Sequence, residues 1–370
     1  MKFAIVKSDL IKPLSHINSV VERKNAIAIL SNLVIEAVSK EINFIATDME
    51  IDIKEKIIAN IISDGKVTVP AQTLHDIVKK FPDGSEILMQ ANDNNLTIEC
   101  GKSKFTLPTL PFDDFPVMTD ILDGKEFSIS SADIKNLIDN TKFAISLEET
   151  RYYLNGIYIH TVEEENEERF RVVATDGHRL SRLSTELPLN AKNLEGVIIP
   201  RKTVIELRKI IDGKQNTVKI QLSKNKIRFG IDNISLTSKL LDGAFPDYEK
   251  VIPSNNTKEL IIDNKEFIDA VDRVSTVSSD RTRAIKFELT DKQLIISAEN
   301  PDQGSAKEYL SVHYTGDKLD IGFNSRYLLD IAKQISGAQV KFLLSDKLSP
   351  TLIFDDDDKQ ALYLLMPMHI

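Results

Sequence analysis

Apolar residues recur at helical spacing in six stretches of the chain. In the second stretch, Leu74, Val78 and Phe81 lie three or four positions apart, and Phe267 and Val271 repeat the spacing later. Such spacing gathers apolar side chains on one face of a helix. The pattern predicts helices over residues 8–24, 72–81, 131–143, 201–212, 264–278 and 325–336.

Between these stretches the pattern changes to strict alternation. In residues 170–175, Phe170, Val172 and Ala174 share one face of an extended chain. Turn signals such as Asp83-Gly84 and Asp212-Gly213 separate the alternating runs. We therefore expect antiparallel sheets with helices packed on them, which is the α+β class.

Three landmarks recur in the same order at intervals of about 125 residues. A strand ends in a polar corner at Asp48, Asp176 and Asn300. A short strand opens each unit and leads into its first helix, and a second one leads into the second helix. The repeat predicts three domains of one fold, over residues 1–122, 123–253 and 254–370, each with two helices on antiparallel sheets.

The totals of the chain exclude several classes of protein. The 370 residues contain one Cys and six scattered His, which gives neither a disulfide framework nor a zinc pattern. No window approaches the ~18 apolar residues of a membrane span. The composition predicts a cytoplasmic protein with no membrane association, no metal and no cofactor.

Charge is distributed unevenly along the chain. The net charge is −9, yet the six predicted helices together hold more basic than acidic residues. An acidic protein rarely coats nucleic acid with its whole surface. Mildly basic helices can still contact phosphates loosely and without sequence specificity. The acidic runs 163–168 and 355–358 are interpreted as solvated loops.

The densest group of functional side chains lies in residues 174–180. Asp176, His178 and Arg179 surround Gly177 directly after a predicted strand. A metal-dependent hydrolase using Asp176 and His178 is one interpretation, but it needs further ligands or a base. The equivalent corners at Asp48 and Asn300 carry no His, which favours an architectural role for Asp176. A repeat scaffold without a nucleic-acid role is the remaining alternative.

The whole chain resembles one family, the bacterial DNA polymerase III beta subunits or sliding clamps. The resemblance rests on the repeat, on residues 151–156, 174–180 and 197–202, on residues 241–248, and on Met366-Pro367-Met368. It implies a head-to-tail homodimeric ring that encircles duplex DNA and tethers the replicative polymerase. It also implies a protein without an active site.

The resemblance assigns roles to particular positions. Partners, namely the polymerase alpha subunit, clamp-loader subunits and other proteins with a clamp-binding peptide, would insert that peptide between the second and third domains. The implied peptide-binding residues are Arg151, Leu154, Thr175, Gly177, His178, Arg179, Leu180, Pro246, Val251, Asn324, Tyr327, Met366, Pro367 and Met368. Without the family, Leu154 and Leu180 are equally well interpreted as core. The implied DNA contacts are Lys24, Tyr152, Tyr153, Arg201 and Lys202, and the implied dimer contacts are Phe105 and Leu107 against Val277.

The chain departs from the family pattern at several positions. His369-Ile370 stands where the family usually has Arg-Leu, and residues 347–350 replace a smaller Ser-rich segment. Gln72 and Glu148 stand where a base and an amide are expected at the DNA. These differences predict altered peptide preference and altered contact with DNA.

Overall fold

The computed structural model describes residues 1–22, 26–92, 94–213, 216–358 and 360–369. Its contacts divide the chain into two compact units. Unit 1 comprises residues 1–135, 188–191 and 202–240, and unit 2 comprises residues 136–187, 192–201 and 241–370. The central repeat is therefore shared between the units, because its strands pair with strands of both neighbouring repeats.

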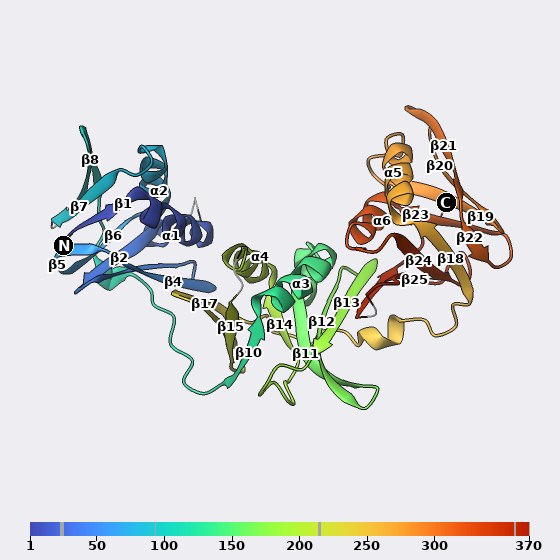
Figure 1. Ribbon diagram of the computed structural model, residues 1–370, viewed down its shortest axis with the longest axis horizontal. Helices are drawn as coiled ribbons and strands as arrows, with labels where there is room; N and C mark the ends of the chain where they lie inside the picture. Colours follow the sequence, from blue (N-terminus) through green and yellow to red (C-terminus); the bar gives the residue numbers. More distant parts are fainter. Residues whose placement is uncertain (23–25, 93, 214–215, 359, 370) are drawn as a thin grey trace. The chain divides into compact units, whose positions relative to one another are not determined.

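All six predicted helices are confirmed, each within a few residues of its expected ends. They are α1 (Lys7–Val20), α2 (Ala71–Lys80), α3 (Ser131–Thr141), α4 (Arg201–Ile210), α5 (Asn264–Ser275) and α6 (Ser325–Ala332). Helices α1 and α2 pack together in unit 1, and α5 and α6 pack together in unit 2 (Figure 1). Their buried faces carry the apolar residues of the sequence pattern, such as Leu74, Val78 and Phe267.

Unit 1 contains two antiparallel sheets. The first has the order β5-β1-β7-β8-β9 and the second has the order β10-β15-β16-β17-β4-β3-β2-β6. Their strands are β1 (Lys2–Val6), β2 (Asn32–Val38), β3 (Glu41–Thr47), β4 (Ile51–Ile58), β5 (Asn60–Ser63), β6 (Gly65–Pro70), β7 (Glu86–Asn92), β8 (Asn95–Cys100), β9 (Ser103–Pro108), β10 (Lys125–Ser130), β15 (Thr217–Leu222), β16 (Lys226–Ile231) and β17 (Ile234–Lys239).

Unit 2 also contains two antiparallel sheets. Their orders are β14-β11-β12-β13-β26-β25-β24-β18-β22 and β21-β20-β19-β23. The strands are β11 (Gly156–Glu164), β12 (Glu167–Thr175), β13 (Arg179–Glu186), β14 (Val197–Pro200), β18 (Lys258–Asp263), β19 (Ala284–Thr290), β20 (Gln293–Asn300), β21 (Gly304–Ser311), β22 (His313–Thr315), β23 (Leu319–Asn324), β24 (Gln339–Leu344), β25 (Thr351–Asp355) and β26 (Ala361–Leu365). The α+β class predicted from the sequence is confirmed.

The three polar corners share one hydrogen-bond pattern. The side-chain oxygens of Asp48, Asp176 and Asn300 each accept a hydrogen bond from the amide two residues later, at 2.8, 2.9 and 3.0 Å. This is the local side-chain capping for which Asp and Asn are favoured in turns. The corner is thus an architectural element of all three repeats.

One acidic run differs from its interpretation as a solvated loop. Asp355 is only 4 % exposed and accepts hydrogen bonds from the amides of Ser336 and Gly337. Burial alone would raise the pKa of Asp355, but these amides and that of Asp357 together hold it below its usual value. Only the residues after Asp355 form the exposed part of the run, because the strand β25 continues to Asp355 itself.

Candidate functional site

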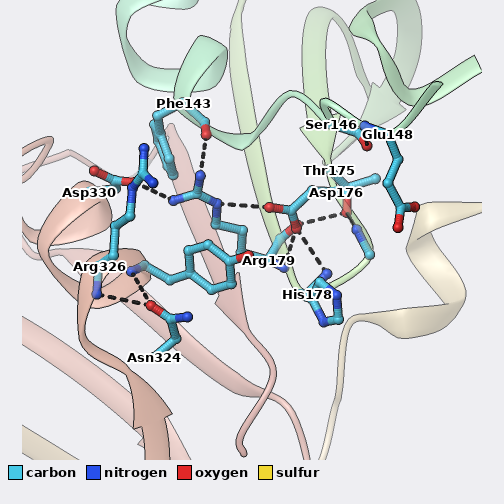
Figure 2. A network of polar contacts seen from close by, with 12 residues as sticks. Phe143, Ser146, Glu148, Thr175, Asp176, His178, Arg179, Asn324, Arg326 and Asp330 are labelled. Atoms are coloured by element: carbon cyan, nitrogen blue, oxygen red, sulfur yellow. Dashed lines mark hydrogen bonds and ion pairs between the residues drawn. The ribbon is translucent and has the colours of Figure 1, made fainter. Parts of the chain in front are cut away.

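The corner at residues 174–180 is held by its own side chains. Thr175 Oγ1 donates to the carbonyl of Arg179 at 2.7 Å and accepts from the amide of Gly177 at 3.0 Å. Asp176 Oδ1 accepts from the amides of His178 and Arg179 (Figure 2). Gly177 has φ +87°, and a Cβ there would lie 2.7 Å from Arg151 Nη1. A residue with a side chain would therefore displace Arg151.

Arg179 connects this corner to helix α6. Its guanidinium donates to Asp176 Oδ2 at 3.1 Å, to Asp330 Oδ2 at 2.6 Å and to the carbonyl of Phe143 at 2.5 Å (Figure 2). It also lies 4.3 Å from the centre of the Tyr327 ring. The side chain is almost fully buried, so these partners replace its hydration.

Asn324 and Tyr327 are positioned by the start of α6. Asn324 caps the helix, because its Oδ1 accepts from the amides of Arg326 and Tyr327 at 3.0 and 3.3 Å. The Tyr327 ring then lies beside the His178 ring, with 6.4 Å between their centres. Burial raises the pKa of the Tyr327 hydroxyl, so it stays protonated and able to donate.

The end of the chain is fastened to the same corner. The amide of Met366 donates to the carbonyl of His178, and that of Met368 to the carbonyl of Gly322, both at 2.8 Å. The Met366 side chain is nevertheless 36 % exposed. An exposed Met on a fixed backbone presents an adaptable apolar contact to a ligand.

These elements surround a cavity of about 580 Å³ in unit 2. Of the predicted peptide-binding residues, Arg151, His178, Arg179 and Tyr327 line it, and the other ten are not among its lining residues. Its further lining residues are Lys142, Phe143, Ile145, Ser146, Leu147, Glu148, Asp176, Arg201, Arg326 and Asp330. The cavity is rich in cations, and Glu148 forms an ion pair with Arg151 that lowers the Glu148 pKa.

An apolar cluster surrounds Leu180, one of the predicted peptide-binding residues. Leu180 packs there with Tyr248, Leu352 and Leu364. Leu154 and Leu180 are 3 % and 2 % exposed, so in the free protein both are core residues. By contrast, Pro246 and Val251, which lie on either side of Tyr248 in the sequence, are both exposed, and Val251 is 51 % exposed.

A buried arginine holds this segment in place. Arg171 donates to Glu249 at 2.7 Å and to the Tyr248 hydroxyl at 3.3 Å, and it pairs with Glu164 at 2.8 Å. His160 Nε2 lies 3.0 Å from the same hydroxyl. Burial raises the pKa of Tyr248 to about 12. The network fixes the short helix η5 (Tyr248–Val251), which carries Val251.

The geometry predicts a large cost for changing Arg179. In Arg179→Lys the planar guanidinium that reaches three acceptors is lost, and the partly buried carboxylates of Asp176 and Asp330 are left without a full partner. We expect the free energy of unfolding to fall by about 3 kcal/mol. Urea denaturation measures it. Arg169→Lys is the control, since within the described part of the chain Arg169 forms an ion pair only with the exposed Glu167. A loss no larger than that of the control would contradict this account.

The family of the chain follows from its comparison with known proteins. Family models described as DNA polymerase III beta subunit match it in three parts: the N-terminal domain at residues 1–119, the central domain at 128–247 and the C-terminal domain at 249–369. The chain belongs to this family. The sequence-based resemblance is thereby confirmed, and a repeat scaffold without a nucleic-acid role is not favoured.

Known sliding clamps match this chain over its whole length. The beta sliding clamp of Caulobacter vibrioides is 44% identical over 372 residues, and that of Escherichia coli is 35% identical over 371, each with 100% of both chains covered. The solved sliding clamp of Bartonella birtlesii, bound to griselimycin, is 46% identical and superposes with a TM-score of 0.98 over 100% of both chains. The three-domain clamp fold is thus confirmed.

The residues predicted to contact DNA differ in their solvent exposure and in their internal partners. Lys24 lies outside the described residues. Tyr152 is 52 % exposed and stands edge to face against Tyr153, and Arg201 is exposed at the start of α4. The Lys202 ammonium instead binds Asp48 and the carbonyl of Val20.

Two departures from the family pattern at the expected DNA face are explained by internal partners. Gln72 accepts from Asn18 at 3.1 Å and donates to Asp76 at 2.9 Å. Glu148 is paired with Arg151. Both side chains therefore support neighbouring groups of the clamp.

The predicted dimer contacts lie at or near sheet edges. Phe105, on the edge strand β9, is 39 % exposed and stands edge to face on Phe81 at 5.8 Å. Leu107, on the same strand, is buried, and Val277 is half-buried after α5. These observations leave the dimer assignment as a prediction.

Sequence reasoning missed part of the cavity wall. Phe143, Arg326 and Asp330 receive or surround the Arg179 side chain, yet none belongs to a family motif that we recognised. The spacing of Arg326 and Asp330, four apart on one helix face, was the available signal. Among the described residues there is no group of three or more His, Cys, Asp or Glu side chains that could hold a metal. In the same residues no helix is long and apolar enough to cross a membrane.

Proposed function

We propose that this sliding clamp is a non-catalytic processivity factor that closes around duplex DNA as a head-to-tail homodimer in the cytoplasm. It tethers the replicative polymerase and other partners through a pocket between its second and third domains, over residues 123–253 and 254–370. The observation that carries the proposal is the way in which neighbouring repeats join.

Both internal junctions are made by the same kind of strand pair. At the first junction β4 pairs with β17, and at the second junction β13 pairs with β26, both antiparallel. The repeat makes β21 the third counterpart of β4 and β13, and β9 the third counterpart of β17 and β26. Each of these two strands is an edge of its sheet. At both internal junctions a strand of the β4 kind pairs with a strand of the β17 kind. The unpaired edges β21 and β9 are of these two kinds, which favours their pairing between two copies.

The repeat also predicts the register of the contact between copies. At the first junction Ile53 pairs with Leu236. Ala46 pairs with Ile53 across the first corner and Ala298 with Ala306 across the third, whose loop is one residue longer. With Phe105 as the counterpart of Leu236 after the hairpin before β9, the equivalent pair is Ala306 of one copy with Phe105 of the other. Each copy then offers one edge of each type, so a heterologous contact that closes after two copies gives a ring.

The side chains suit loose contact with DNA and firm contact with peptides. Tyr152, Tyr153, Arg201 and Lys24 are the proposed DNA contacts, with Lys202 restrained by its carboxylate partners. Such few contacts give weak, salt-dependent affinity, which is what sliding needs. The peptide pocket combines the apolar cluster around Leu180 with the exposed Met366, so an apolar anchor of a partner peptide can bind between them.

Topological retention tests the proposal. After loading by a clamp loader, the protein is expected to remain on nicked circular plasmid through gel filtration in high salt. Linearising the plasmid with a restriction enzyme should release nearly all of it, because a ring slides off free ends. Equal retention on circular and linear DNA would contradict encirclement and would indicate ordinary binding.

A further inference from the structure

The first junction reproduces the backbone of the second junction, where partner peptides are proposed to bind. The amide of Lys239 donates to the carbonyl of Glu50 at 2.9 Å, as that of Met366 does to His178 at 2.8 Å. The amide of Leu241 donates to the carbonyl of Ile198, as that of Met368 does to Gly322. Met49 takes the place of Gly177 and also has positive φ, at 74°.

The side chains on this shared backbone have the opposite chemistry. At the second junction, Leu180 pairs with Leu364, which pairs with Leu352. In the same register at the first junction, Asp52 pairs with Thr237, which pairs with Arg228. Lys239 likewise stands in the place of Met366. Three leucines and a methionine of the apolar pocket are therefore replaced by polar or charged residues.

A groove follows these replaced positions in unit 1. It consists of two hollows of about 230 and 130 Å³ that share Met118. The larger hollow is lined by the apolar side chains of Met49 and Val117 and by Lys226 and Lys239. The smaller contains Asp52, Lys54 and Arg228. We call this the polar groove.

The floor of the polar groove contains an unsatisfied carboxylate. Asp52 is 4 % exposed, and its Oδ2 accepts from the amide of Met118 at 3.1 Å. Its Oδ1 is closed off from solvent and has no partner at normal hydrogen-bond geometry. Burial raises the pKa of Asp52, although the nearby Thr47 hydroxyl and the Met118 amide oppose the rise. The ammonium of Lys54, which also lines the smaller hollow, has no ion-pair or hydrogen-bond partner among the described residues. A buried carboxylate oxygen without a donor is costly, and the positive charge of Lys54 offsets part of that cost.

Lys226 donates to the carbonyl of Thr119 at 2.9 Å, and the two remaining cations of the groove bind exposed, exchangeable carboxylates. Arg228 donates to Asp120 at 2.6 Å, and Lys239 donates to Glu50 at 2.9 Å. Asp120 and Glu50 are 68 % and 66 % exposed. These carboxylates show that the groove accommodates acidic side chains at its rim, and a ligand can exchange with them.

We propose that the polar groove is a second docking site, which binds an extended acidic peptide segment of a partner protein. The peptide presents carboxylates to Lys54 and Lys239, and rests an apolar side chain on Met49 and Val117. The site is distinct from the peptide pocket at the second junction and goes beyond the proposed function.

Nucleic acid fits the groove less well than a peptide does. A nucleic-acid strand carries a negative charge at every nucleotide, so some phosphates would lie beside Asp52 and Asp120. A peptide can instead place neutral residues beside these carboxylates and its acidic residues beside the lysines. The walls at Met49 and Val117 suit an aliphatic side chain. The backbone frame also matches the junction that is proposed to hold partner peptides.

Fluorescence anisotropy tests the site with a defined probe. The probe is a fluorescein-labelled synthetic peptide in which Glu and Ser alternate around one central Leu. We expect saturable binding to the full-length protein, and at least about ten-fold weaker binding when every Glu is replaced by Gln. Lys54→Gln and Lys239→Gln should each weaken binding about five-fold, which is the effect of losing one partly exposed ion pair.

Lys40→Gln is the matched control, since Lys40 is an exposed cation of the same unit away from the groove. It should bind the probe as the unsubstituted protein does. Probe binding that is absent at millimolar protein, or equal in Lys54→Gln and Lys239→Gln, would overturn the proposal. Displacement of the probe by an oligothymidylate at lower concentration than by unlabelled peptide would also overturn it. Retention on circular DNA, measured with the same variants, reports separately on the proposed function.

Discussion

Removal of residues 366–370 is expected to weaken the binding of clamp-binding peptides by at least about a hundred-fold. The deletion takes away Met366 and Met368, whose burial against a ligand contributes about 1.5–3 kcal/mol each. It also removes the hydrogen bond from the Met366 amide that ties the chain end to His178. Surface plasmon resonance with an immobilised partner peptide measures the loss.

Dimerisation and two single substitutions distinguish a local loss of the peptide site from a general loss of structure. The strand β26 ends at Leu365, so the deletion leaves the sheet intact and the protein should still sediment as a dimer. Met366→Ala should reproduce most of the loss. Met49→Ala, which shortens a comparably exposed Met at the first junction, should leave it unchanged. If the truncated protein binds partner peptides normally, the pocket has been assigned to the wrong place.

Phe105→Arg is expected to convert the protein into a monomer at micromolar concentration. Pairing of β9 with β21 of a second copy would bury the new charge without a partner, at a cost of several kcal/mol. The cost arises at both contacts of the ring, so the dimer dissociation constant should rise by at least about a thousand-fold. Sedimentation velocity measures the change, and retention on circular DNA should disappear with it.

Ile58→Arg provides the control for the introduced charge. Ile58 is 80 % exposed and lies at the end of β4, which belongs to neither the sheet of β9 nor the sheet of β21. This variant should remain dimeric. Phe105→Arg should keep its thermal unfolding temperature as a folded monomer, since the side chain is partly exposed already. A dimer that tolerates Arg at position 105 would show that β9 does not form the contact.

The fold was predictable because its signals are local and repeated. Helical spacing at Leu74 and Val78, and corners at Asp48 and Asp176, each depend on a few neighbouring residues. Occurring three times, such weak signals support one another. Asp355 was misjudged because an acidic run is usually solvated, whereas its partners Ser336 and Gly337 come from a distant turn.

The candidate site was predictable only in part. The corner residues and the chain end came from a family resemblance, and nothing in their spacing places Arg179 against Asp330. That contact requires knowledge of how β13 meets β26, which is a tertiary pairing. The reversal of chemistry at the first junction was hidden for the same reason. Asp52 and Thr237 look like ordinary strand residues until the two strands are paired.

The pairing of β4 with β17, and of β13 with β26, has a mechanical consequence for a ring. Each internal junction is a continuous antiparallel sheet reinforced by a covalent connection, so tension along the ring is carried there by many hydrogen bonds and by the chain itself. The proposed contact between copies would have no covalent reinforcement. A loader that strains the ring is therefore expected to open it at that seam, and rupture of one seam is enough to admit DNA.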